Sequence, residues 1–219
     1  MKVCTDACLF GAFVANETAN EKLFRILDIG TGTGLLSLML AQKSTANIDS
    51  IEIDTAACEQ AKENIAASPW KEKITTINAD ITTFNSKNKY DLIISNPPFF
   101  EGDLQSANEQ KNAAKHDAAL TLEQLLVAAN NNLNKEGIFA VLLPYHRVDY
   151  FIKESAAKGL YLTNRLLVKQ APTHNFFRGI LIFSKTNSGL QSNELSIKDN
   201  KGNYTGEFTG LLKDYYLYL

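Results

Sequence analysis

Four consecutive residues near the middle of the chain have the chemistry to hold a flat NH2 group: Asn96, Pro97, Pro98 and Phe99. Proline lacks an amide hydrogen, so the two prolines stiffen the backbone and leave carbonyl oxygens free to accept hydrogen bonds. Phe99 adds an apolar face for stacking. Two acceptors, the Asn96 side chain and the Pro97 carbonyl, would localise the lone pair of a planar amine. They would thereby aim this weak nucleophile at an electrophilic carbon.

A glycine-rich segment supplies a candidate ligand-binding turn, in which Asp28, Gly30, Gly32 and Gly34 alternate with Ile and Thr. Glycine adopts positive φ and lets the backbone approach a ligand closely. A dinucleotide site would place its third glycine one residue later and admit a pyrophosphate, for which Asp28 is a poor neighbour. The turn therefore favours a ligand with an uncharged linker and an ammonium group, and it disfavours an NAD-dependent oxidoreductase.

Two more acids follow predicted strands. Glu52 ends the second strand, where a carboxylate can accept both hydroxyls of a ribose, and Asp54 is the alternative two residues on. Asp80 follows the third strand and can accept the exocyclic amine of an adenine. Each acid alone is more often a solvated loop residue or a helix cap. Their joint spacing instead predicts a site for an adenosine-containing cofactor.

Short apolar runs alternate with helical segments along the first two thirds of the chain, as in parallel βαβ units. Strands are predicted at 24–29, 48–53, 74–78, 91–95 and 138–143, and helices at 35–41, 56–67 and 121–132. Two further strands, 160–168 and 176–183, follow without a helix between them, which predicts an antiparallel last strand. The expected fold class is α/β, a Rossmann-like, doubly wound, mostly parallel sheet of seven strands.

We expect a single domain over residues 1–219, since this length and a 45% hydrophobic composition suit one buried core. Residues 1–20 form its N-terminal motif and helix, and residues 186–219 a C-terminal extension packed on its edge. No apolar run approaches the ~20 residues of a membrane span, and no signal peptide is evident. Three Cys and three His match no metal-ligand spacing. The expectation is a cytoplasmic monomer without a metal or a membrane partner.

Two motifs together, residues 28–34 and 95–99, resemble those of the class I amino-methyltransferases. More narrowly, segments 1–6, 52–70 and 178–183 resemble the bacterial valine tRNA adenine-37 N6-methyltransferase family, and the similarity covers most of the chain. The resemblance implies a Rossmann-like class I methyltransferase that binds S-adenosylmethionine and releases S-adenosylhomocysteine. It also implies a tRNA partner, whose adenine 37 is methylated on its N6 amine by direct SN2 transfer.

The motifs and the resemblance together assign two sets of residues. The cofactor set is Thr5, Asp28, Gly30, Gly32, Gly34, Glu52, Asp80 and Asn96, and the catalytic set is Asn96, Pro97, Pro98 and Phe99. Thr5 and Asp6 match a segment that helps close the site over the methionyl moiety. Two features depart from the family pattern. Phe99 stands where Tyr is commonest, and the chain begins inside the Lys-x-x-Thr-Asp motif, which family members usually precede with a further segment.

The charge distribution bears on how such a chain would bind RNA. The net charge is −2, but residues 1–110 carry 9 Lys and Arg against 15 Asp and Glu, whereas residues 111–219 carry 13 against 9. We therefore expect phosphate contacts from the second half, although solvated surface charge is the commoner explanation of such residues. The candidates for RNA contact are Lys111, Lys115, His116, Lys169 and Arg178.

Other functions fit parts of this pattern. A glutamine of a translation release factor presents the same planar NH2 for N5-methylation, but enzymes of that group carry a helical N-terminal domain for which this chain has no room. A DNA adenine methyltransferase would need a target-recognition domain to read base edges. A non-catalytic S-adenosylmethionine-binding protein is the alternative from another class, and the intact motif at residues 96–99 disfavours it.

Overall fold

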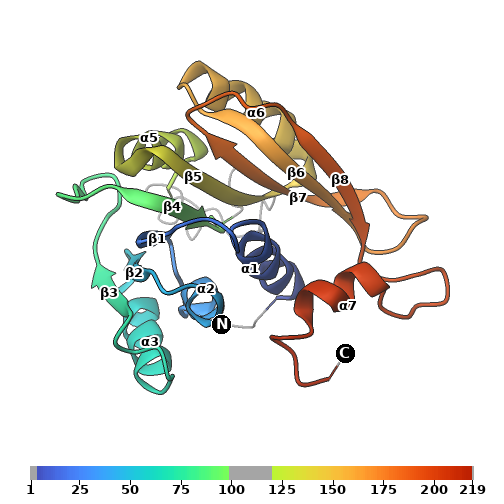
Figure 1. Cartoon of the computed structure of the whole chain (residues 1–219), viewed down its shortest axis with the longest axis horizontal. Helices are drawn as coiled ribbons and strands as arrows, with labels where there is room; N and C mark the ends of the chain where they lie inside the picture. The colour runs from blue at the N-terminus through green and yellow to red at the C-terminus, as the bar shows by residue number, and fades with distance from the viewer. Residues whose placement is uncertain (1–3, 99–119, 219) are drawn as a thin grey trace, which may run out of the picture.

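One eight-stranded sheet forms the centre of the computed structural model, which describes residues 4–98 and 120–218 (Figure 1). The strands are β1 (Arg25–Ile29), β2 (Asn47–Glu52), β3 (Ile74–Asn78), β4 (Tyr90–Ser95), β5 (Leu133–Pro144), β6 (Tyr161–Lys169), β7 (Phe176–Ser184) and β8 (Gln191–Ser196). Their order across the sheet is β3-β2-β1-β4-β5-β7-β6-β8. Neighbours pair in parallel except at β7, which runs antiparallel to both β5 and β6.

Helices cover both faces of this sheet (Figure 1). One face carries α1 (Thr5–Glu17), α2 (Leu35–Lys43), α3 (Thr55–Ala66) and α7 (Gly206–Leu212), and the other carries α5 (Leu122–Asn132) and α6 (Val148–Ala157). A short 3-10 helix, η1 (Tyr145–Arg147), joins β5 to α6. No helix within the described segments is both long and apolar enough to cross a membrane.

The central strands are apolar on both sides because successive side chains point to opposite faces and both faces are covered. In β1, Ile26 packs into the core beneath α1 and α2, whereas its neighbour Leu27 packs into the core beneath α5 and α6. Both side chains are fully buried. A sheet held in this way from two sides gives the loops at its carboxyl edge a rigid base.

The predicted α/β fold is confirmed, and the predicted antiparallel strand is β7. The sheet nevertheless has eight strands rather than the predicted seven, because β8 of the C-terminal extension pairs with β6. Leu195 is the one buried residue of β8, so this edge strand lacks an apolar pattern in the sequence. The same extension ends in α7, whose Phe208 and Leu212 are buried in the core on the α1 side.

Candidate active site

A cavity of about 830 Å³ opens at the carboxyl edge of the sheet, where β1, β2 and β4 end. Ligands of doubly wound folds bind at this edge. Seven of the predicted site residues lie in its wall: Gly30, Gly32, Glu52, Asp80, Asn96, Pro97 and Pro98. The start of α1 contributes Cys4 and Ala7, and the first turn of α5 contributes Gln124. The parallel sheet thus brings together motifs that are far apart in the sequence.

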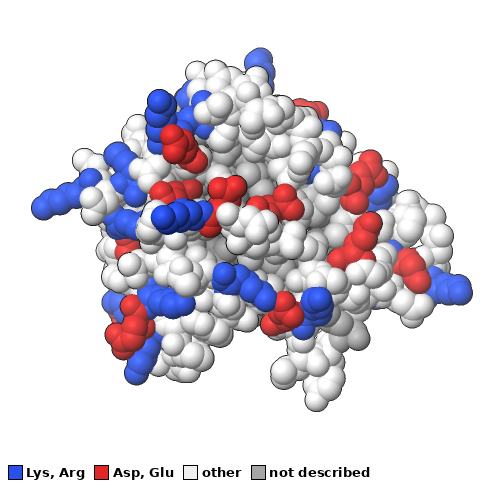
Figure 2. All heavy atoms as spheres, viewed as in Figure 1, with Lys and Arg blue, Asp and Glu red and all other residues white. Residues whose placement is uncertain are grey.

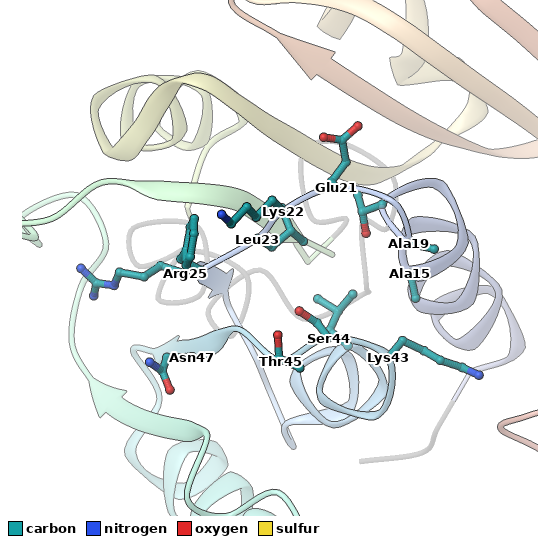
Figure 3. A pocket seen from close by; sticks show the side chains of 13 residues that line it. Ala15, Ala19, Glu21, Lys22, Leu23, Arg25, Lys43, Ser44, Thr45 and Asn47 are labelled. Carbon is teal, nitrogen blue, oxygen red and sulfur yellow. The ribbon is translucent and has the colours of Figure 1, made fainter.

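A second cavity, of about 540 Å³, lies at the opposite edge beside the amino ends of β1 and β2 (Figure 3). None of the predicted site residues that the structure describes lies in its wall. The basic side chains of Arg25 and Lys43 point outward from it in Figure 3 and pair with Asp49 and Asp214. Helices α1 and α2 also end here, and helix C-termini disfavour anionic ligands. The cavity at the carboxyl edge is therefore the candidate active site.

The glycine turn forms one wall of this candidate site. Gly30 and Gly32 have φ values of 70° and 58°, a left-handed conformation that a residue with a side chain rarely adopts. The backbone amides of Gly30 and Thr31 both donate to the carbonyl of Ile51, which fixes the turn against β2. Gly34 lies behind the wall, where it precedes α2 with φ 84°. The turn therefore presents backbone directly to the cavity.

Asp28 lies beneath this turn and is fully buried rather than exposed in the cavity wall. Its Oδ2 accepts hydrogen bonds from the hydroxyls of Thr31 at 2.6 Å and Ser37 at 2.7 Å. Burial raises the pKa of the Asp28 carboxyl to about 6, although these two hydroxyl donors act in the opposite direction. The position indicates that Asp28 shapes the turn from behind.

Glu52, at the last position of β2, lies in the cavity wall, as does the alternative acid Asp54. Its Oε2 accepts from the Gly32 amide at 2.9 Å, and its Oε1 accepts from the Asp54 amide at 3.0 Å. Each oxygen keeps a further lone pair for a ligand hydroxyl. The alternative acid, Asp54, uses its Oδ1 to cap α3 by accepting from the amide of Ala57. The geometry therefore favours Glu52 as the acceptor for a ribose.

Apolar residues beside these acids were missed by the sequence analysis. Ile53 follows Glu52 and lies in the cavity wall, although 55% of its surface is exposed. Ile81 follows Asp80 in the same wall, and Asp80 Oδ1 is held by the amide and hydroxyl of Thr82. A flat base bound near Asp80 would find apolar contacts here. The available signal in the sequence was an isoleucine directly after each of the two acids.

The end of β4 presents Asn96 to the cavity. The hydroxyl of the preceding residue, Ser95, donates to the carbonyl of Ile29 at 2.9 Å and ties β4 to β1. Oδ1 of Asn96 is buried and accepts no hydrogen bond from any residue that the structure describes. Leaving a buried acceptor unpaired costs about 1–3 kcal/mol, so a ligand NH2 would satisfy it. Phe99, predicted to stack on the target, lies outside the described residues.

The other predicted residues, Thr5 and the candidates for RNA contact, do not lie in the cavity wall or fall outside the described residues. Thr5 begins α1 and is exposed beside the wall rather than in it. Arg178 donates from Nε to Oδ2 of Asp6 at 2.8 Å, and Lys169 pairs with Glu194 at 3.1 Å. The other candidates for RNA contact, Lys111, Lys115 and His116, lie outside the described residues. Within residues 4–98 and 120–218, no three His, Cys, Asp or Glu side chains are grouped as metal ligands.

Comparison with known proteins identifies the family. Residues 10–150 match the model of the methyltransferase small domain. The tRNA1(Val) (adenine(37)-N6)-methyltransferase of Bacteroides thetaiotaomicron is 41% identical, over 100% of this chain and 92% of its own. The enzyme of the same name from Dyadobacter fermentans is also 41% identical, over 99% of this chain and 91% of its own. The chain belongs to the methyltransferase small domain family.

Family membership makes the chain a methyltransferase with S-adenosylmethionine as its cofactor. The crystal structure of a predicted O-methyltransferase from Agrobacterium tumefaciens shares the fold, with a TM-score of 0.73 over 97% of both chains at 18% identity. The cavity suits the cofactor, since Glu52, Asp80 and the apolar Ile53 would hold an adenosine beside the glycine turn. When bound, S-adenosylmethionine supplies an electrophilic methyl group.

Glu52→Gln should raise the dissociation constant for S-adenosylmethionine about tenfold. The substitution replaces one carboxylate oxygen by an NH2 group, which would face a backbone amide and a ribose hydroxyl that both need an acceptor. Asp54→Asn is the matched control, since asparagine caps a helix as well as aspartate does. Calorimetric titration of both variants with the cofactor gives the comparison. Loss of affinity in Asp54→Asn with no change in Glu52→Gln would assign the ribose to Asp54 instead.

Proposed function

We propose that this methyltransferase acts on the N6 amine of adenine 37 in a valine tRNA. The observation that carries the proposal is the buried Oδ1 of Asn96, an acceptor without a partner among the described residues at the end of β4. An exocyclic NH2 is the group that such an acceptor suits. The relatives from Bacteroides thetaiotaomicron and Dyadobacter fermentans, which carry this activity in their names, support the choice of substrate.

The catalytic contribution of the chain is orientation and electrostatics. Asn96 Oδ1 and the Pro97 carbonyl each accept one hydrogen of the target amine, so that the nitrogen lone pair is drawn out of conjugation with the ring. Ser95 holds the strand end that carries both acceptors, through its bond to Ile29. Phe99 would stack on the base. This arrangement requires no nucleophilic side chain, because the amine nitrogen itself forms the new bond.

The same acceptors would suit the amide of a glutamine, so N5-methylation of a release factor is the competing activity. An adenine in an anticodon loop is accessible because single-stranded RNA can extrude a base at little cost.

Acidic and basic side chains are intermixed over the face shown in Figure 2, so RNA contact would rest on a few local cations. We propose Lys111, Lys115, His116 and Lys169 for this role. We also propose that the enzyme works in the cytoplasm as a monomer.

Asn96→Ala should lower kcat at least about 100-fold while the affinity for S-adenosylmethionine is unchanged, because Asn96 serves the target amine. Asn193→Ala, at an exposed position of β8, is the matched control and should retain full activity. Steady-state methylation of tRNA and calorimetric titration of the cofactor measure the two quantities. A parallel loss of cofactor affinity would show that Asn96 belongs to the cofactor site and would remove the argument for an amine substrate.

Lys169→Gln should weaken tRNA binding, since one phosphate contact is removed. The salt slope, which is the slope of the logarithm of the binding constant against the logarithm of the salt concentration, should fall in magnitude by about one. Lys62→Gln is the control, because Lys62 also pairs with a glutamate but lies on α3. Binding of tRNA across a salt series compares them with the wild type. Efficient methylation of a release-factor peptide, together with a flat salt response, would instead support the glutamine methyltransferase alternative.

A further inference from the structure

We propose that Arg178 is a positioning residue for cofactor binding, which holds the first turn of α1 against the cavity through its ion pair with Asp6. The pair joins residues 172 positions apart in the sequence. The inference concerns the cofactor, so it stands independently of which RNA is methylated. It also gives Arg178 a role within the protein in place of the phosphate contact expected from the sequence.

The first turn of α1 is part of the cavity wall on either side of Asp6. Cys4 and Ala7 both line the cavity, whereas the side chain of Asp6 points to Arg178. Cys4 precedes the helix without making a side-chain cap. Contacts with the rest of the fold, such as the pair of Asp6 with Arg178, therefore help to set the position of this turn relative to the cavity.

Arg178 offers a fixed point for such a contact. It lies near the start of β7, opposite Pro144 at the end of β5, and hence at the edge of the sheet where the cavity opens. Gly179, the next residue, packs so closely that an added Cβ would come within 2.5 Å of Val148 Cγ2. The backbone beside Arg178 thus has little freedom to move away from the sheet.

Both oxygens of the Asp6 carboxylate accept hydrogen bonds. Asp6 Oδ2 accepts from Arg178 Nε at 2.8 Å, and Oδ1 accepts from the amide of Ala7 at 3.0 Å. The side chains are only 24% and 15% exposed for Arg178 and Asp6, so solvent and salt screen the pair less than a surface pair. Arg178 also donates from Nη1 to the carbonyl of Phe177 and lies over the ring of that residue.

The body of α1 is held by apolar packing and does not need this pair. Leu9, Phe10 and Val14 are completely buried in the core. Loss of the ion pair should therefore leave the helix in place and loosen its first turn. This separation between fold and first turn makes the proposal testable by cofactor binding rather than by activity alone.

The test uses Asp6→Asn, Arg178→Gln, the double variant and Arg178→Lys, each titrated with S-adenosylmethionine by calorimetry. Each neutral single variant should raise the dissociation constant roughly 3- to 30-fold, the range of coupling through packed contacts. The double variant should bind the cofactor no more weakly than the weaker-binding of the two single variants, because the two residues act as one unit. Arg178→Lys keeps the charge and should restore part of the affinity, and thermal unfolding should change little in all four.

Arg165→Gln is the matched control, since the guanidinium of Arg165 on β6 donates to the hydroxyl of Ser192 and lies outside the cavity wall. Its affinity for the cofactor should equal that of the wild type. Unchanged affinity in both neutral single variants, or strictly additive losses in the double variant, would overturn the proposal. A lower tRNA affinity and salt slope in Arg178→Gln but not in Asp6→Asn, with cofactor affinity intact, would restore the phosphate-binding role.

Discussion

The parallel pairing of β1 with β4 is the constraint on which the site depends. Ile29 and Ser95 are direct partners at the ends of these strands, and the Ser95 hydroxyl donates to the Ile29 carbonyl. The glycine turn continues from the first strand end, and Asn96 continues from the second. A methyl donor and a target amine held by these segments would therefore meet at one edge of the sheet.

Beneath that edge, the structure keeps polar groups where apolar ones would pack more simply. Asp28 accepts from Thr31 and Ser37, and Ser37 shares a hydrogen bond of 2.6 Å with Ser50 of β2. Desolvation makes a buried carboxyl costly, as its raised pKa of about 6 indicates. The network ties the turn, α2 and β2 together. The buried polar groups thus provide directional bonds, which apolar contacts lack.

Local patterns explain why most of the site could be predicted from the sequence. The glycine turn and Asn96 directly follow apolar strands, and Glu52 is the last residue of one, so their place at the carboxyl edge depends only on the strand ending where the pattern ends. The partner of Arg178 was not predictable in this way, because Asp6 is distant in the sequence and nothing local indicates the contact. Likewise, β8 was missed because an exposed edge strand needs no apolar alternation.

The central claim is that the reacting atom is an exocyclic amine held by Asn96. The most direct measurement compares methyl incorporation into two valine tRNA transcripts, one with adenine at position 37 and one with inosine, followed by mass spectrometry of the nucleosides. Inosine has a carbonyl where adenine has the amine, so the two acceptors would face another acceptor in place of the NH2 group, and there is no N6 nitrogen to methylate. The account predicts N6-methyladenosine from the first transcript and no methylated product from the second. Comparable methylation of the inosine transcript would contradict it, because another atom would then be the target.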